Sequence, residues 1–138
     1  MNIRELMSRD VQTVAPWDTL QHAAQVMREH DFGFLPVEEN ERLVGMLTDR
    51  DIAIRAVARG LAPADNPVRE AMSADVLYVY EDETVEDAVR NMSELQVRRL
   101  PVLSRDKQLV GVISLGDLAI NQPQHAGDAL SSIAQPVI

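Results

Sequence analysis

The chain has 138 residues, of which 46% are hydrophobic and 25% are charged, a composition typical of a globular domain rather than a disordered segment. Its 22 acidic and 13 basic residues give a net charge of −9, which argues against nucleic acids and anionic membrane surfaces as partners. The absence of cysteine excludes disulfides, thiol nucleophiles and thiolate metal sites. There is no basic segment followed by an apolar stretch at the start, and no apolar run approaches about 18 residues, so we expect a soluble cytoplasmic protein.

One pattern of apolar residues occurs twice along the chain. Residues 11–14 (Val-Gln-Thr-Val) and 76–79 (Val-Leu-Tyr-Val) each open a segment of about fifty residues, the second 65 positions after the first. A repeated unit of this size cannot easily bury its hydrophobic face alone. We therefore expect the two copies to pack on each other with pseudo-two-fold symmetry and to leave clefts between them.

Each opening strand is followed by an amphipathic helix. The helices are predicted over residues 18–27 and 83–92, where apolar residues recur with the period of a helix. Thr19 and Thr84 stand just before the apolar stripes as N-caps. The matching stripes predict that the two helices bury equivalent faces.

Two short strands follow the helix in each copy. They are predicted over residues 34–37 and 43–47 in the first copy, and over 99–102 and 109–113 in the second. The earlier strand of each pair contains Leu-Pro-Val, and proline suits a sheet edge because it cannot donate a ladder hydrogen bond. A further helix follows, so the predicted fold class is α+β, with the order β-α-β-β-α repeated twice.

The domain boundaries follow from the repeat. Short lead-in helices are predicted over residues 3–7 and 68–72, and a segment rich in glycine and proline separates the copies. The expected divisions are a first domain with its lead-in helix, a linker with the second lead-in helix, a second domain, and a tail without assigned chemistry. They cover residues 1–60, 61–75, 76–121 and 122–138 respectively.

Both copies end their last strand in a hydroxyl followed three residues later by an aspartate. The pairs are Thr48 with Asp51 and Ser114 with Asp117. One interpretation is a capping box at the start of the next helix. The other is a ligand site, because helix N–H groups hold anions and an aspartate carboxylate accepts hydrogen bonds from a ribose diol.

Two other positions of the repeat are relevant to a ligand site, one that is the same in both copies and one that differs. Gly45 and Gly111 precede the hydroxyls by three residues, where a missing side chain either admits a flat base or permits a bulge or tight packing. The residues before the Leu-Pro-Val strands are Gly33 and Phe34 in the first copy but Arg98 and Arg99 in the second. Adjacent arginines form either a solvated surface or a bidentate phosphate site.

The duplicated unit, the Leu-Pro-Val strands and the Gly-x-x-Thr/Ser-x-x-Asp endings resemble a pair of cystathionine β-synthase (CBS) domains, a Bateman module, over residues 3–120. The resemblance implies a stand-alone regulatory protein that binds AMP, ADP, ATP, S-adenosylmethionine or another adenosyl ligand between the domains. The implied residues of the better site are Thr13 and Val14 at the adenine, Asp51 at the ribose, Thr48 at the ribose or the phosphate, and Arg98 and Arg99 at the phosphate. A weaker second site is implied at Tyr78, Val79, Ser114 and Asp117, without a cation.

The resemblance also implies a homodimer, in which helices over residues 52–57 and 118–120 form the contact, and an unidentified effector protein. We do not expect an enzyme, a resident cofactor or a metal site. The three histidines, His22, His30 and His125, are scattered and none has metal-ligand spacing to a second strong ligand. The alternative function is a ligand-free module that binds its protein partner directly.

Overall fold

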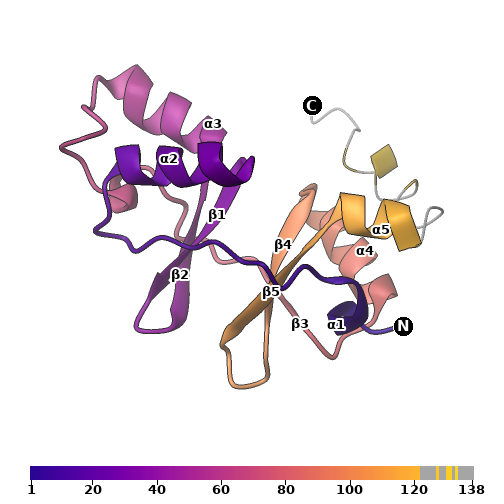
Figure 1. The fold of residues 1–138 in the computed structure, drawn as a ribbon. Helices are drawn as coiled ribbons and strands as arrows, with labels where there is room; N and C mark the ends of the chain where they lie inside the picture. Colours follow the sequence, from indigo (N-terminus) through magenta and orange to yellow (C-terminus); the bar gives the residue numbers. More distant parts are fainter. Residues whose placement is uncertain (122–126, 128–129, 132, 134–138) are drawn as a thin grey trace. The chain divides into compact units, whose positions relative to one another are not determined.

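The computed structural model describes residues 1–121, 127, 130, 131 and 133, and it divides into two compact units (Figure 1). The first unit is Gln12–Val76. The second unit combines Met1–Val11 with Leu77–Ile138. Each unit contains one copy of the repeat.

The first unit is a β-hairpin covered by helices. Strand β1 (Phe34–Glu39) pairs antiparallel with β2 (Arg42–Thr48), with a bulge between Val37 and Glu38. The helical segments are α2 (Leu20–His30) before the hairpin, α3 (Asp49–Asp51), the π-helix η1 (Ile52–Ala56) and the 3-10 helix η2 (Val57–Arg59) directly after it, and the 3-10 helix η3 (Val68–Glu70). The buried core combines helix and strand residues, among them Leu20, Ala23, Leu35, Leu47 and Ala56.

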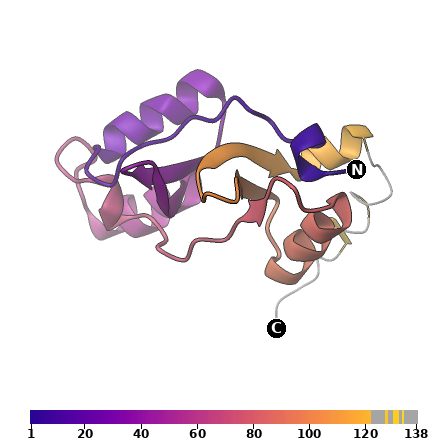
Figure 2. The ribbon, with the colours of Figure 1, turned by 90° about the horizontal axis from the view of Figure 1, so that it is seen from below.

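The second unit contains a three-stranded sheet. Strand β4 (Arg99–Leu103) lies in the middle, parallel to β3 (Val79–Tyr80) and antiparallel to β5 (Leu109–Ser114). Its helices are α1 (Ile3–Leu6), α4 (Val85–Leu95) and α5 (Leu115–Asn121), and α1 lies beside α5 (Figure 2). The buried core again combines helix and strand residues, among them Ala88, Met92, Leu100, Ile113 and Leu118.

The predicted N-caps of the two long helices are confirmed. The Thr19 hydroxyl accepts a hydrogen bond from the backbone N–H of His22 at 3.0 Å. The Thr84 hydroxyl accepts one from Asp87 at 3.2 Å, and the Asp87 carboxylate accepts the Thr84 N–H in return. Each cap satisfies helix N–H groups that have no partner within the helix.

The opening strands are shorter than the sequence predicts. Only Val14 pairs with β1, and β3 begins at Val79. The Val14 N–H donates to the Pro36 carbonyl, and the Val14 carbonyl accepts from the Glu38 N–H. In a parallel ladder the next bond would need an N–H from Pro36, which proline lacks, so the pairing stops.

Proline does not mark an edge strand in the second unit, contrary to the sequence-based expectation, because Pro101 lies in the central strand β4. Its partner across the antiparallel pair is Val112, whose N–H and carbonyl both bond outward to Ser8 at 2.9 Å. In an antiparallel pair, two directly opposite residues either both bond to each other or both point their backbone N–H and carbonyl groups away from each other. Because Val112 bonds outward, the backbone groups of Pro101 also point away from β5. The missing donor of Pro101 therefore removes no bond between β4 and β5.

The two lead-in segments pack on opposite copies of the repeat. The first, which the sequence pattern grouped with residues 1–60, contributes Ile3, Leu6 and Met7 to the core of the second unit. The second contributes Val68 and Ala71 to the core of the first unit. A linear repeat cannot reveal this exchange, because both lead-in segments precede their own copy by the same number of residues.

Candidate functional site

Both hydroxyl–aspartate pairs form capping boxes. In the first unit, the Asp51 N–H bonds to the Thr48 hydroxyl at 3.0 Å and the Thr48 N–H to Asp51 Oδ2 at 2.9 Å. In the second unit, Ser114 and Asp117 make the same two bonds at 3.1 and 2.9 Å. The capping interpretation is therefore confirmed for both pairs, and it uses one oxygen of each carboxylate.

The other carboxylate oxygen of Asp51 has a partner that the sequence analysis missed. Arg55 places its Nε 3.8 Å from Asp51 Oδ1 and donates from Nη1 to the Met72 carbonyl at 3.3 Å. The only sequence signal for this pair is the spacing of four residues along a helix. Since the Asp51 side chain is 19% exposed, the pair leaves this carboxylate partly accessible.

Gly45 and Gly111 serve close packing of the main chain. A Cβ on Gly45 would lie 2.8 Å from both the Met72 sulfur and the Ser73 carbonyl oxygen. A Cβ on Gly111 would lie 2.7 Å from the Met7 sulfur and 2.8 Å from the Ser8 carbonyl oxygen. The space beside each glycine is thus filled by a lead-in segment, and the alternative of a base approaching there is wrong.

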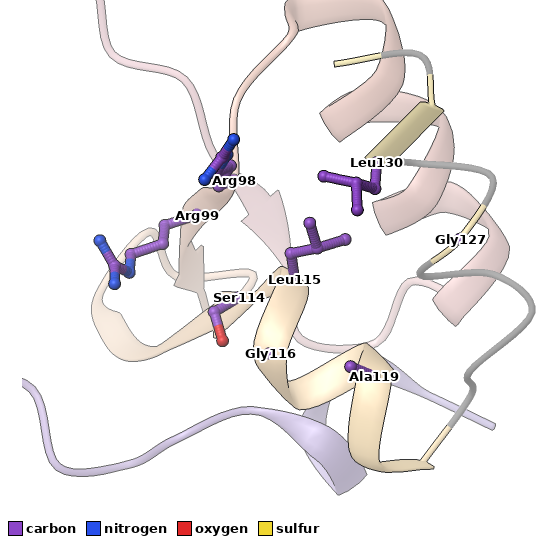
Figure 3. A pocket seen from close by; sticks show the side chains of 8 residues that line it. All are labelled: Arg98, Arg99, Ser114, Leu115, Gly116, Ala119, Gly127 and Leu130. Atoms are coloured by element: carbon purple, nitrogen blue, oxygen red, sulfur yellow. The ribbon is translucent and has the colours of Figure 1, made fainter. Parts of the chain in front are cut away.

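The arginines before β4 line a pocket of about 620 Å³ in the second unit (Figure 3). Arg99 lies opposite Ser114 in the β4–β5 pair, and the Leu115 N–H bonds to the Arg98 carbonyl at 2.8 Å. This strand pairing and this hydrogen bond place both arginines beside the start of α5. Within residues 77–121, no carboxylate forms a salt bridge with either guanidinium. The pocket therefore has two exposed cations that are available to an anion.

The equivalent place in the first unit has the opposite charge. The Asp49 N–H bonds to the Gly33 carbonyl at 3.0 Å, as Leu115 does to Arg98. A Cβ on Gly33 would lie 2.8 Å from Asp49 Oδ2, so this carboxylate covers the position that corresponds to Arg98. A phosphate is disfavoured there because it would meet a like charge.

The residues predicted to hold adenine lie at the opening strands. Val14 and Val79 are buried. The Thr13 hydroxyl bonds to the Glu38 carboxylate. The pKa of Glu38 is raised, mainly by burial and also by the nearby Glu41, although the bond to Thr13 lowers it. Tyr78 packs edge-on against Tyr80, with ring centroids 5.5 Å apart. The two opening strands thus offer different chemistry, acidic in one unit and aromatic in the other.

A charged and aromatic cluster beside Tyr80 was not anticipated from the sequence. The Arg105 guanidinium lies 4.1 Å from the Tyr80 ring centroid and bonds through Nε to Asp82 at 2.9 Å. The bond to Arg105 lowers the pKa of Asp82, and the pKa of Tyr80 is raised mainly by its hydrogen bond with Tyr78. The separation of 23 residues between Asp82 and Arg105 gives no sequence signal for this contact.

The predicted site residues are divided between the units. The first unit holds Thr13, Val14, Thr48 and Asp51, and the second holds Tyr78, Val79, Arg98, Arg99, Ser114 and Asp117. The structure brings Arg98 and Arg99 together with Ser114 in one pocket. The predicted pairing of these arginines with Thr48 and Asp51 stays a prediction, because each unit is described by itself.

The described residues contain no group of three or more His, Cys, Asp or Glu side chains that could hold a metal ion. In the same part of the chain, no helix has the length and apolar character needed to span a bilayer.

Comparison with known proteins identifies the family. The CBS domain matches the chain twice, over residues 3–57 and 68–122. The chain therefore belongs to the CBS domain family and contains a tandem pair of these domains. The predicted α+β fold with two CBS repeats is confirmed.

Three relatives place the chain among CBS proteins. It is 42% identical to the CBS domain-containing protein YhcV of Bacillus subtilis over 135 residues, which cover 96% of this chain and 95% of YhcV. The crystal structure of Hypoxic Response Protein I with two coordinated zinc ions matches with a TM-score of 0.81 and 40% identity, covering 89% of this chain and all of that one. The structure of CBSX2 in complex with AMP matches with a TM-score of 0.76 and 25% identity, covering 89% and 96%.

Proposed function

We propose that this CBS pair is a regulatory module that binds an adenine nucleotide or another adenosyl compound and signals to an effector protein. The observation that carries the proposal is the pocket that Arg98, Arg99 and Ser114 line together. The complex of the similar CBSX2 with AMP supports the choice of ligand class. The adenosyl compound would act as a regulatory ligand rather than as a resident cofactor.

The phosphate of such a ligand would bind at the two arginines. Guanidinium groups form paired hydrogen bonds with phosphate oxygens, and neither group has a salt bridge within residues 77–121. In a chain with a net charge of −9, an anion needs a local cationic site to overcome the overall repulsion. The arginine pair supplies such a site. The equivalent place in the first unit, beside Gly33, has the negative charge of Asp49 instead.

The ribose ligands proposed for the better site are Thr48 and Asp51, with Ser114 and Asp117 at the weaker site. Each aspartate uses one carboxylate oxygen for its capping box. The second oxygen of Asp51 lies 3.8 Å from Arg55 Nε. This separation is longer than a hydrogen bond, so a ribose hydroxyl could bind this oxygen in competition with Arg55. Thr13 and Val14 remain the proposed adenine contacts of the better site.

A thermal-shift series with AMP, ADP, ATP and S-adenosylmethionine tests the proposal. A ligand present at a hundred times its dissociation constant should stabilise the protein by about 2.7 kcal/mol. Arg98→Ala should remove the shift for phosphate-bearing ligands. Arg90→Ala is the control, because Arg90 is an exposed arginine of α4 in the same unit that pairs with Asp87 instead of lining the pocket. The absence of a shift with all four compounds would count against the proposal and in favour of direct protein recognition.

We also propose that the chain forms a homodimer through the helical segment after β2. Ile54 and Val57 are 50% and 60% exposed although they are large and apolar. The other helix predicted for this contact is less suitable, because Leu118 is fully buried in the second unit. A pair of exposed apolar side chains one helical turn apart fits a contact between subunits.

A further inference from the structure

Residues 1–8 bind the rest of the second unit through their backbone. At one end of this segment the Ile3 N–H donates to the Glu83 carbonyl at 2.9 Å. At the other end Ser8 exchanges both of its backbone hydrogen bonds with Val112 of β5, each at 2.9 Å. Helix α1, between these points, lies beside α5 and β5 (Figure 2). The segment is therefore bound as a short helix followed by a residue added to a strand edge, two common ways of recognising a peptide.

Three apolar side chains anchor the same segment. Ile3 is fully buried, and Leu6 and Met7 are 9% and 8% exposed, all within the core of the second unit. Gly111 makes room for the Met7 sulfur, which lies 2.7 Å from the position of an added Cβ. The second unit thus has a binding site whose apolar pockets and hydrogen-bonding groups fit residues 1–8.

The path of the chain separates this segment from its binding site. The whole first unit lies along the chain between residues 1–11 and the rest of the second unit. The connection into the first unit is residues 9–13, which form neither helix nor strand and contain one turn, in which the Val11 N–H bonds to the Arg9 carbonyl at 3.1 Å. The conformation of these five residues therefore decides which copy of the binding site the segment can reach.

We propose that the second unit also binds residues 1–8 of a second copy of this chain, so that two copies exchange these segments. The exchanged contacts are the same as those within one chain, which makes such an exchange a low-cost route to a dimer. The segment attached to the same chain has the higher effective concentration, so the exchanged form is the minor one at micromolar protein. The exchange uses neither the arginine pocket nor Ile54 and Val57, and it does not depend on the proposed function.

The first unit provides an internal comparison. Its lead-in segment binds in the same way, because Ser73 exchanges both backbone hydrogen bonds with Met46. The loop that precedes this segment belongs to the same unit, and the Asn66 carbonyl accepts the Leu20 N–H of α2 at 2.9 Å. The chain therefore holds residues 68–73 beside their own binding site, and we expect no exchange there.

Disulfide trapping with two separate variants tests the exchange, since the chain has no cysteine of its own. Ser8→Cys and Val112→Cys are prepared as different full-length chains, both with Val57→Lys to remove the subunit contact proposed above, then mixed and oxidised. Opposite residues that exchange both hydrogen bonds have Cα atoms about 5.5 Å apart, within reach of a disulfide. Mass spectrometry of the linked peptides should show disulfides between positions 8 and 112 at least about tenfold more often than disulfides between two identical positions.

The matched control is a mixture of Met46→Cys and Ser73→Cys chains, which have the equivalent geometry in the first unit. This mixture should give only the yield of random collisions. Equal yields in the two mixtures would overturn the inference. It would also be overturned if the double variant Ser8→Cys/Val112→Cys closed its disulfide within one chain while the mixed single variants formed none between chains.

A change in the length of the connection gives a second, independent test. Deletion of Asp10 and Val11 removes about 7 Å of reach and should favour the exchanged form, whereas insertion of two glycines after Asp10 should not. With Val57→Lys present in both, light scattering should show a dimer for the deletion and a monomer for the insertion. A monomeric deletion variant, or a dimer in both variants, would refute the exchange.

Discussion

The Met72 sulfur occupies the space that a side chain at Gly45 would need, with 2.8 Å between the sulfur and an ideal Cβ position. The neighbouring Ser73 exchanges both backbone hydrogen bonds with Met46, at 2.8 and 2.9 Å. Gly111 has the same relationship to Met7 and Ser8 in the second unit. The glycine in each repeat thus allows a lead-in segment to pair with the outer edge of a strand.

Gly45→Ala and Gly111→Ala should each lower the free energy of unfolding by about 1–3 kcal/mol, the usual cost of inserting a methyl group into a packed region. The carbonyl oxygens at 2.8 Å belong to the backbone and cannot rotate away as a side chain could. Urea denaturation of each variant measures the loss.

Gly116→Ala is the control for these substitutions. Its added Cβ would meet nothing nearer than the Ser114 hydroxyl at 3.5 Å, and Gly116 lies within α5. Replacing this glycine, which lies in the first turn of the helix, by alanine should leave stability unchanged or raise it by at most about 1 kcal/mol. Equal stability changes in all three variants would contradict the role assigned to Gly45 and Gly111.

The helices and the hairpins could be predicted because their signals are local. The apolar stripe after Thr84 and the strand residues of β4 and β5 each lie in one short continuous segment, so their periods can be read from neighbouring residues alone. The length of the opening strands could not be predicted in this way. It depends on which N–H groups the neighbouring strand offers, and Pro36 withholds one.

The candidate site could be predicted only in part for a similar reason. The spacing of Ser114 and Asp117 reveals a capping box, and Arg98 and Arg99 stand out as the residues that differ between the copies. Leu130 carries no such signal, because no residue near it in the sequence indicates that it lines the same pocket as Arg98. Leu118 illustrates the converse, since an apolar residue of a short helix can face either the core or a partner, and here it faces the core.

The capping box of α4 should make stability depend on pH in the acidic range. The Thr84 backbone N–H, the Thr84 hydroxyl and Arg90 together lower the pKa of Asp87. A carboxyl with a lower pKa in the folded state contributes stability above its unfolded pKa of about 4, and this contribution is lost as the pH falls through the folded pKa. Asp87→Asn should therefore lower the melting temperature at neutral pH and reduce the decline of the melting temperature as the pH falls below about 4.

Glu86→Gln controls for the loss of one negative charge in the same turn. Glu86 lies beside Asp87 in the first turn of α4 but does not form the capping box with Thr84. Melting curves of this variant should follow the wild type more closely across the acidic range. If Asp87→Asn and Glu86→Gln change the pH profile equally, the effect comes from net charge and not from the cap.

The proposed subunit contact predicts a change of oligomeric state. Val57→Lys places a charge at a side chain that is 60% exposed in the single chain, so it should not disturb the fold. In a dimer the same lysine would be buried without a partner, which is costly. Light scattering after size-exclusion chromatography should show a dimer for the wild type and a monomer for Val57→Lys. Leu95→Lys is the control, and a monomeric wild type would contradict the contact.

The two aspartates of the capping boxes allow the roles of the two copies to be separated. Asp51→Ala and Asp117→Ala each remove a carboxylate that accepts a backbone N–H, so each should cost about 1–2 kcal/mol of stability without ligand. Their effects on the adenine nucleotide shift should differ. Asp51→Ala is expected to abolish the shift, because Asp51 is the proposed ribose ligand of the better site, whereas Asp117→Ala should retain most of it. The opposite result would assign the ribose to the unit that contains Arg98 and Ser114, and the nucleotide would then lie within the second unit's own pocket.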